Sequence, residues 1–250
     1  MKFSVFTAFI CIFILMIFLV FKLPLWFYLL VVMLPLAVII IYFSFIYSFR
    51  KSVVPQSVPE KGYDDRLAVL KEAETKLVPI GFEKFDQFHL KMIPDSVTFA
   101  FKHTREPIYC CVYHFGQKMT CDMVTYFNYE VSLTTCSSID GGASPRAPKS
   151  LLQIFHGATY DTLLAQHLYG IGFLKQNRFD PVEIPAGSFR DSFMKEIREY
   201  AERIRKIPLW PVMLLIWTLS KYGKRYAKPL QEQYPNGISH IFQTGPRLLE

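Results

Sequence analysis

The sequence lacks the short motifs by which many enzyme classes are identified. It has no Gly-x-x-x-x-Gly-Lys phosphate loop, no Gly-x-Gly-x-x-Gly turn and no His-Glu-x-x-His pair. The nearest approach to a serine-hydrolase elbow, Gly142-Ala143-Ser144-Pro145, lacks the second glycine of Gly-x-Ser-x-Gly. Cys-x-x-Cys and His-x-x-x-His spacings are also missing, and no internal repeat is visible. We therefore expect no cofactor and no metal.

Cysteine is scarce, and its five positions do not suggest a disulfide framework. Their number is odd, Cys11 lies in a long apolar run, and Cys110 and Cys111 are adjacent in the chain. The remaining two are Cys121 and Cys136. Secreted domains stapled by disulfides have even sets of spaced cysteines, so this pattern agrees with a reducing compartment.

Charge is missing from two long segments at the N-terminus. Residues 3–21 and 25–49 are apolar and uncharged, and only Lys22, Leu23 and Pro24 separate them. About 20 helical residues cross a bilayer core about 30 Å thick, so each segment is long enough to span. The sequence predicts a transmembrane helical hairpin over residues 1–51. A cleavable signal peptide is the alternative, but no small-x-small cleavage site follows the first run.

Basic residues near the two segments predict the orientation of the hairpin. The short loop carries one of them, Lys22, whereas Lys2, Arg50 and Lys51 lie on the other side. Because cytosolic flanks are enriched in Lys and Arg, we expect both termini and the main domain to be cytosolic. Trp26 and Tyr28 would then lie at the opposite bilayer interface.

The rest of the chain predicts an α+β domain. Residues 52–61 contain prolines and serines and are expected to be a linker, and residues 62–250 form the domain. Residues 64–77 have helical periodicity, and a period of two follows, with apolar residues alternating around 88–92, 97–101, 108–112 and 121–136. Short links between these runs predict an antiparallel meander of about five strands, with a turn at Asn128-Tyr129 and flanking helices.

Later segments predict a loop and two further helices. Residues 137–149 are dense in Gly, Ser and Pro and predict a mobile loop. Thr159 is a suitable N-cap for a helix whose face includes His167. Mixed charges predict a solvated helix over about 188–205.

A short apolar run near the C-terminus predicts another contact with the bilayer. Residues 209–219 are too few to span a membrane, but they contain two tryptophans and have basic flanks. An interfacial helix over about 208–222, lying on an anionic leaflet, has this composition. A buried core helix and a re-entrant segment are the alternatives. The predicted membrane contacts are Trp26, Tyr28, Arg50, Lys51, Trp210, Trp217, Lys221, Lys224 and Arg225.

The strand registers bring cysteines together. In a hairpin that turns near residues 115–118, the numbers of two facing residues sum to about 233. Cys110 then lies diagonal to Cys121 on one sheet face. A turn at Asn128-Tyr129 sets Cys121 opposite Cys136, and His114 lies near them in register. Such a set could suit zinc. Free cysteines are commonly buried as small hydrophobic residues, and core thiols are the favoured interpretation.

One polar constellation is a candidate for catalysis. His156 and His167 lie on either side of the Thr159 cap, and they could line a pocket with Asp161. A structural histidine with satisfied hydrogen bonds is the more frequent case. We therefore expect a non-catalytic accessory or scaffolding protein at the membrane surface, with an exposed sheet face or the Gly141-Gly142 loop as its binding surface.

The expected partners follow from the anchor and the charge. The formal net charge is +7, which together with the anchor favours an anionic leaflet, and other membrane-protein subunits are further candidates. Nucleic acid is not expected, because the apolar run between the basic clusters suits lipid better than a phosphate backbone. The alternative function is a membrane-associated enzyme that acts on a lipid-like or small hydrophobic substrate.

Overall fold

The computed structural model describes residues 25–48, 54–59, 61–91, 96–115, 118–138, 146–147, 149–185, 187–219 and 221–238. The chain divides into two compact units, Met1–Ile46 and Tyr47–Glu250, and each is described by itself. The predicted first span at residues 3–21, Arg50, Lys51 and the Gly141-Gly142 loop lie outside the described residues.

The first unit contains α2 (Leu25–Ser48), a continuous helix with Pro35 inside it. Within it, Leu29–Ser48 is long and apolar enough to cross a membrane, and it is the one such helix among the described residues. The second half of the predicted hairpin is therefore helical. The hairpin itself stays a prediction, because its first half is not described.

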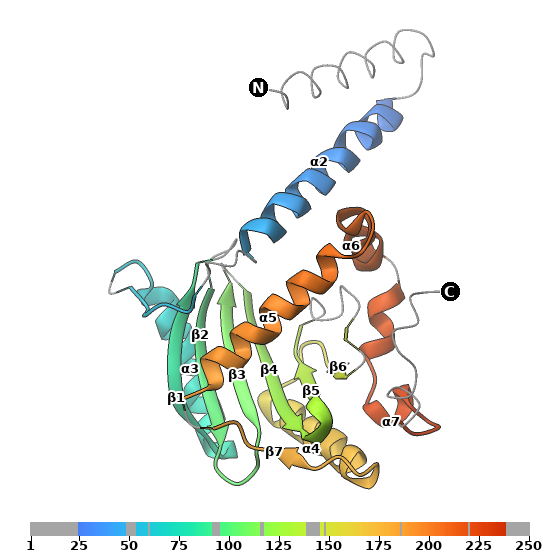
Figure 1. Cartoon of the computed structure of the whole chain (residues 1–250). Coiled ribbons are helices and arrows are strands. Elements are labelled where there is room, and N and C mark those ends of the chain that lie inside the picture. Colours follow the sequence, from blue (N-terminus) through green and yellow to red (C-terminus); the bar gives the residue numbers. More distant parts are fainter. Residues whose placement is uncertain are drawn as a thin grey trace. The chain divides into compact units, whose positions relative to one another are not determined.

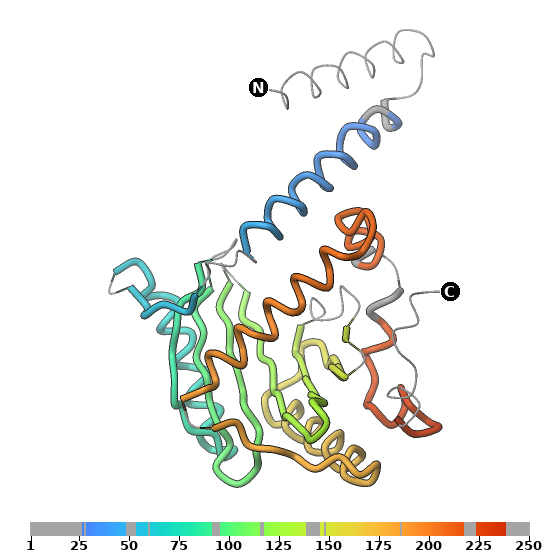
Figure 2. Tube along the Cα trace, viewed as in Figure 1, coloured from blue at the N-terminus to red at the C-terminus, as the bar shows by residue number. Residues whose placement is uncertain are grey.

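The second unit contains one sheet with the strand order β1-β2-β3-β4-β5-β6. Its strands are β1 (Phe82–Leu90), β2 (Ser96–His103), β3 (Tyr109–Phe115), β4 (Lys118–Phe127), β5 (Val131–Cys136) and β6 (Ser150–Ile154). Strands β1 to β5 are antiparallel neighbours in chain order, whereas β6 pairs parallel with β5. A two-residue strand, β7 (Pro181–Val182), pairs with the end of β4. The predicted five-stranded meander is confirmed, and Figure 2 shows its strands side by side in chain order.

The register agrees with the sequence in one hairpin and differs by one residue in the next. Tyr109 pairs with Val124, which matches the predicted sum and places the Sγ atoms of Cys110 and Cys121 3.4 Å apart. Between β4 and β5, however, Asp122 pairs with Cys136. The expectation that Cys121 faces Cys136 is wrong, because the turn takes three residues, Asn128–Glu130, instead of two. Cys136 therefore lies on the opposite sheet face from Cys121.

Helices cover both faces of the sheet (Figure 1). The helices of the second unit are α3 (Asp64–Leu77), α4 (Tyr160–Gln176), α5 (Phe189–Arg205), α6 (Trp210–Leu219) and α7 (Leu230–Gln233), with short 3-10 turns at Val78–Ile80, Asn128–Glu130 and Lys221–Tyr226. α3 and α4 pack on the face that carries Phe99, Cys110 and Leu133. α5 packs on the other face, against Phe88, Tyr109 and Cys111. The binding surface predicted on an exposed sheet face is thus not available where these helices lie.

A bulge in β1 adapts the edge strand to α5. The register shifts between Lys84 and Asp86, which leaves Phe85 as the extra residue. The ring of Phe85 then contacts Phe189 at the start of α5, with the ring centroids 5.1 Å apart. Arg190 adds two hydrogen bonds of 2.6 Å to the carboxylate of Asp86. These contacts fix the N-terminal end of α5 on the sheet.

Replacing Gly170 with alanine is expected to destabilise the domain by about 1–3 kcal/mol. A Cβ at this position of α4 would lie 2.9 Å from Leu133 Cδ2 and 3.2 Å from Gln153 Nε2, both in the sheet beneath the helix. Gly172 of the same helix has open space at its Cβ position and is the matched control. The Gly172→Ala variant should gain up to about 1 kcal/mol from helix propensity. Urea unfolding measures the change in the free energy of unfolding for each variant. Equal changes in the two variants would contradict the close packing of α4 at Gly170.

Candidate functional site

His167, a predicted candidate, lies fully buried between α4 and the sheet. Its Nε2 is 2.9 Å from the hydroxyl of Thr125, and its Nδ1 is 2.6 Å from the hydroxyl of Thr135. Gln153 donates from Nε2 to Thr135 Oγ1 at 2.7 Å and to the carbonyl oxygen of Gln166 at 2.9 Å. Its Oε1 accepts from the Leu230 amide at 3.3 Å. This network joins β4, β5 and β6 to α4 and α7.

The surroundings of His167 suit a structural role. Burial lowers the pKa of its imidazole to about 3, so the ring is neutral at physiological pH. Both ring nitrogens are engaged by threonine hydroxyls, and no solvent reaches the side chain. His156 and Asp161, by contrast, are exposed. The described structure therefore does not place the three residues in a shared environment, and their catalytic role stays a prediction.

A second polar group lies on the α5 side of the sheet, where the sequence indicated none. Cys111, Asp122 and Cys136 are direct cross-strand neighbours on β3, β4 and β5. The two cysteines are buried, whereas Asp122 is partly exposed. The Cys136 thiol is within hydrogen-bonding reach of the Asp122 carboxylate and lies 3.0 Å from the Ser138 carbonyl oxygen. The Asp122 carboxylate therefore lies between two thiols on the sheet face that α5 covers.

Tyr126, Glu196 and Arg146 complete this group, which we call the Asp122 cluster (Cys111, Asp122, Tyr126, Cys136, Arg146 and Glu196). Glu196 of α5 is exposed as a residue, but its carboxyl group hydrogen-bonds to the Tyr126 hydroxyl. The guanidinium of Arg146 is close enough to favour the charged forms of both Asp122 and Glu196. The cluster therefore joins β4, α5 and the segment that connects β5 to β6.

Burial dominates the protonation of the cluster. It raises the pKa of Asp122 from 3.8 to about 6, and the Arg146 charge and the Cys136 hydrogen bond oppose this rise only in part. Burial likewise raises the pKa of Glu196, of both thiols and of the Tyr126 hydroxyl. At neutral pH the thiols are protonated and poorly nucleophilic. The Asp122 carboxyl therefore changes its charge near pH 6.

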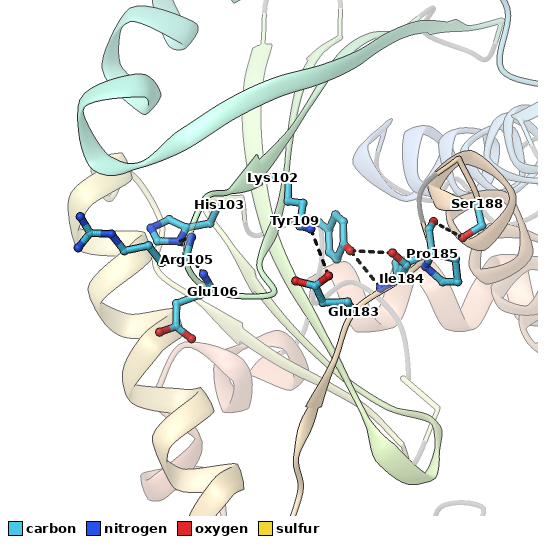
Figure 3. Close-up of polar contacts among 9 residues, drawn as sticks. All are labelled: Lys102, His103, Arg105, Glu106, Tyr109, Glu183, Ile184, Pro185 and Ser188. Atoms are coloured by element: carbon cyan, nitrogen blue, oxygen red, sulfur yellow. Dashed lines mark hydrogen bonds and ion pairs between the residues drawn. The ribbon is translucent and has the colours of Figure 1, made fainter.

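Polar contacts connect the segment before α5 to the sheet (Figure 3). The Tyr109 hydroxyl accepts from the Ile184 amide at 3.0 Å and lies 3.3 Å from the Ile184 carbonyl oxygen. Lys102 pairs with Glu183 at 3.4 Å, and the Ser188 hydroxyl donates to the Pro185 carbonyl oxygen at 2.8 Å. The contacts of Tyr109 and Lys102 tie Ile184 and Glu183 to β3 and β2, close to the start of α5.

The four sheet cysteines are expected to resist thiol reagents in the folded chain. Cys110, Cys111, Cys121 and Cys136 are free and are exposed by 3% or less, and three of the thiols have raised pKa values because they are buried. Maleimide labelling followed by peptide mass spectrometry should find all four unmodified until denaturant is added. Labelling of any of the four in the native chain would contradict their packing. Among the described residues, no group of His, Cys, Asp or Glu is arranged to hold a metal ion.

The described membrane-contact candidates have different surroundings. Trp26 and Tyr28 belong to α2. Trp210 and Trp217 in α6 are only 8% and 4% exposed. Lys221 begins the 3-10 turn Lys221–Tyr226, and within this turn Lys224 and Arg225 are exposed. Cations in the turn after α6 therefore reach solvent, whereas the indoles of α6 are buried.

Two internal arrangements and one surface thus stand out: the His167 network, the Asp122 cluster and the exposed cations that follow α6. The first is buried, and the second is partly open to solvent. Comparison of the chain with protein-family models, curated proteins and solved structures finds no match from which a role for any of them could be taken.

Proposed function

We propose that the chain is a membrane-anchored accessory protein whose α+β domain acts as a binding module at the bilayer surface. The observation that carries the proposal is the surface of α2. Apolar side chains are exposed along its length and around its circumference, including Leu29 (56%), Ile40 (55%) and Phe43 (55%). A helix that is apolar all round belongs either in a protein core or in a membrane. Because these side chains are exposed, hydrocarbon is the medium that suits them.

The orientation of the anchor remains part of the proposal. With the run at residues 3–21, α2 would form a hairpin whose basic flanks face the cytosol. The α+β domain would then lie on the cytosolic side, where its free cysteines remain reduced. Other membrane-protein subunits are the partners that an anchored domain without a recognised catalytic motif fits best.

A strained turn supplies a candidate contact for such a partner. Tyr129 and Glu130 have φ values of 58° and 62°, a conformation unfavourable for residues other than glycine. Tyr129 is 70% exposed, and the nearby Val182 of β7 is 47% exposed. Strain of this kind concentrates at functional sites, and exposed aromatic residues are enriched at interfaces.

Photo-crosslinking in the native membrane tests the accessory role. A photoreactive phenylalanine derivative replaces Tyr129, and the same group at the exposed Lys71 of α3 is the control. We expect one discrete adduct of fixed mass from position 129 and none of that mass from position 71. Identical adduct patterns from the two positions would contradict a specific contact at the turn.

One observation favours the alternative, an enzyme acting on a lipid-like substrate. Asp122 is partly exposed and has a pKa of about 6, which suits a general acid or base near neutral pH. An amphiphile retained through detergent purification and detected by mass spectrometry would support this function. Its loss in the Asp122→Asn variant would locate the amphiphile at the cluster.

A further inference from the structure

The turn between α5 and α6 displays an exposed leucine in a conformation that leucine rarely adopts. Leu209 has a φ of 50°. Its side chain is 77% exposed, the highest value among the large apolar side chains of the described residues. The amides of Lys206 and Ile207 donate to Arg203 and Ile204 at 3.1 and 3.0 Å, and the Met213 amide donates to the Leu209 carbonyl oxygen at 3.1 Å. The backbone therefore holds the leucine outward.

The helix that follows has an apolar outer surface. Trp210 and Trp217 lie two turns apart on one face of α6, and both are buried. Ile216, which points away from that face, is 49% exposed. Every residue of α6 before Thr218 is apolar, including the half-buried Val212 and Leu215. A helix face that meets water is normally polar, so this surface is suited to a different medium.

The positive charge of the chain is concentrated around this corner. Seven Lys and Arg residues and no Asp or Glu lie between positions 203 and 231. Since the whole chain has 28 Lys and Arg and 21 Asp and Glu, the remaining residues are balanced in charge. The exposed cations on the two sides of α6 are Arg205, Lys206, Lys224, Arg225 and Lys228.

We infer that the α5–α6 corner, defined as residues 205–216 with the basic turn 224–228, docks on an anionic bilayer surface. Leu209 and Ile216 enter the headgroup region, and the flanking cations contact anionic lipid. The inference rests on the proposed function, because α2 must first hold the domain at a membrane. It also moves the contact predicted from the sequence: the indoles of Trp210 and Trp217 are buried, and Leu209 takes the place expected for them.

Fluorescence quenching in vesicles tests the contact in the full chain. A Cys11→Ser background leaves the four buried sheet cysteines, so that an environment-sensitive dye can be attached through Leu209→Cys. Tyr129→Cys is the control, since it is exposed and lies in the turn after β4, beside β7, and Figure 1 shows β7 at the opposite end of the sheet from α6. In phosphatidylcholine vesicles containing phosphatidylglycerol and spin-labelled lipid, we expect quenching at position 209 and none at position 129. Equal quenching at both positions, or none at either, would overturn the inference.

Charge reversal tests the chemistry of the partner. Lys206→Glu with Lys224→Glu should reduce quenching at position 209, as should high salt or pure phosphatidylcholine. Lys71→Glu with Arg105→Glu makes the same charge change at exposed positions on α3 and in the turn between β2 and β3, and should have no effect. Equal effects of the two pairs would overturn an electrostatic contact. Flotation of each variant with the vesicles reports anchoring by α2 separately, so failure of the corner is distinguishable from failure of the anchor.

Discussion

Replacement of Asp122 with asparagine is expected to stabilise the α+β domain by about 1–3 kcal/mol at about pH 7.5. The native structure raises the pKa of this carboxyl from 3.8 to about 6, chiefly because it is largely withdrawn from water beside Cys111 and Cys136. Keeping the side chain ionised in that position therefore opposes folding at neutral pH. Asparagine has a similar shape and carries no charge, so it removes this cost.

The stability that Asp122→Asn gains over the wild type should increase with pH. Because the native pKa of Asp122 lies above the unfolded value, the native state binds more protons than the unfolded state between about pH 4 and 6. The wild-type carboxyl thus favours folding at low pH, and this contribution is lost as the pH rises through about 6. The difference between Asp122→Asn and wild type should be largest above that pH and small near about pH 4.

Urea unfolding of the detergent-solubilised chain across this pH range measures the effect. Asp161→Asn is the matched control, because Asp161 is exposed in the first turn of α4 and should cost only about 0.3–1 kcal/mol as a helix-terminal charge. A destabilised Asp122→Asn protein at neutral pH would show that the carboxylate is held by stronger partners than Arg146 and Cys136.

Replacement of His167 with alanine is expected to cost about 3–5 kcal/mol of folding free energy. The change removes a buried ring, leaves a cavity under α4 and deprives the hydroxyls of Thr125 and Thr135 of their shared partner. His156→Ala is the control, since His156 is exposed and should change stability by less than about 0.5 kcal/mol.

His167 also has a pH signature opposite to that of Asp122. Its native pKa of about 3 lies below the ordinary value of 6.5, so the unfolded state binds the extra proton. Its contribution to stability is therefore present above about pH 6.5 and is lost as the pH falls toward 3. In the His167→Ala variant this loss on acidification should disappear. Stability profiles of equal slope in the variant and wild type would show that the ring is not buried in its neutral form.

Local patterns in the sequence were sufficient to predict most of the helices and strands. The apolar spacing before Pro79, the Thr159 cap and the alternation along each hairpin predict α3, α4 and strands β1 to β5, all of which are present. β6 was missed because it pairs parallel with β5 across the loop at 137–149, and nothing local marks such a pairing. Non-local pairing is visible only once the chain is folded.

The Asp122 cluster could not be predicted for a similar reason. A one-residue error in the turn after β4 places Cys136 on the wrong sheet face and removes it from Asp122. Glu196 and Arg146 reach the cluster from segments 74 and 24 residues further along the chain, which no spacing rule connects. The sequence did offer one signal, an acidic residue within an alternating strand whose neighbours are apolar.

The membrane anchor is the central claim, and the accessibility of a thiol in α2 tests it most directly. In open membrane fragments carrying the Cys11→Ser chain, Ile40→Cys should resist a water-soluble maleimide, because a thiol in hydrocarbon does not ionise. Lys71→Cys on α3, which is exposed, should react readily under the same conditions, and both should react after denaturation in detergent. Labelling of Ile40→Cys as fast as Lys71→Cys in the intact membrane would contradict the anchor, and with it the proposed function.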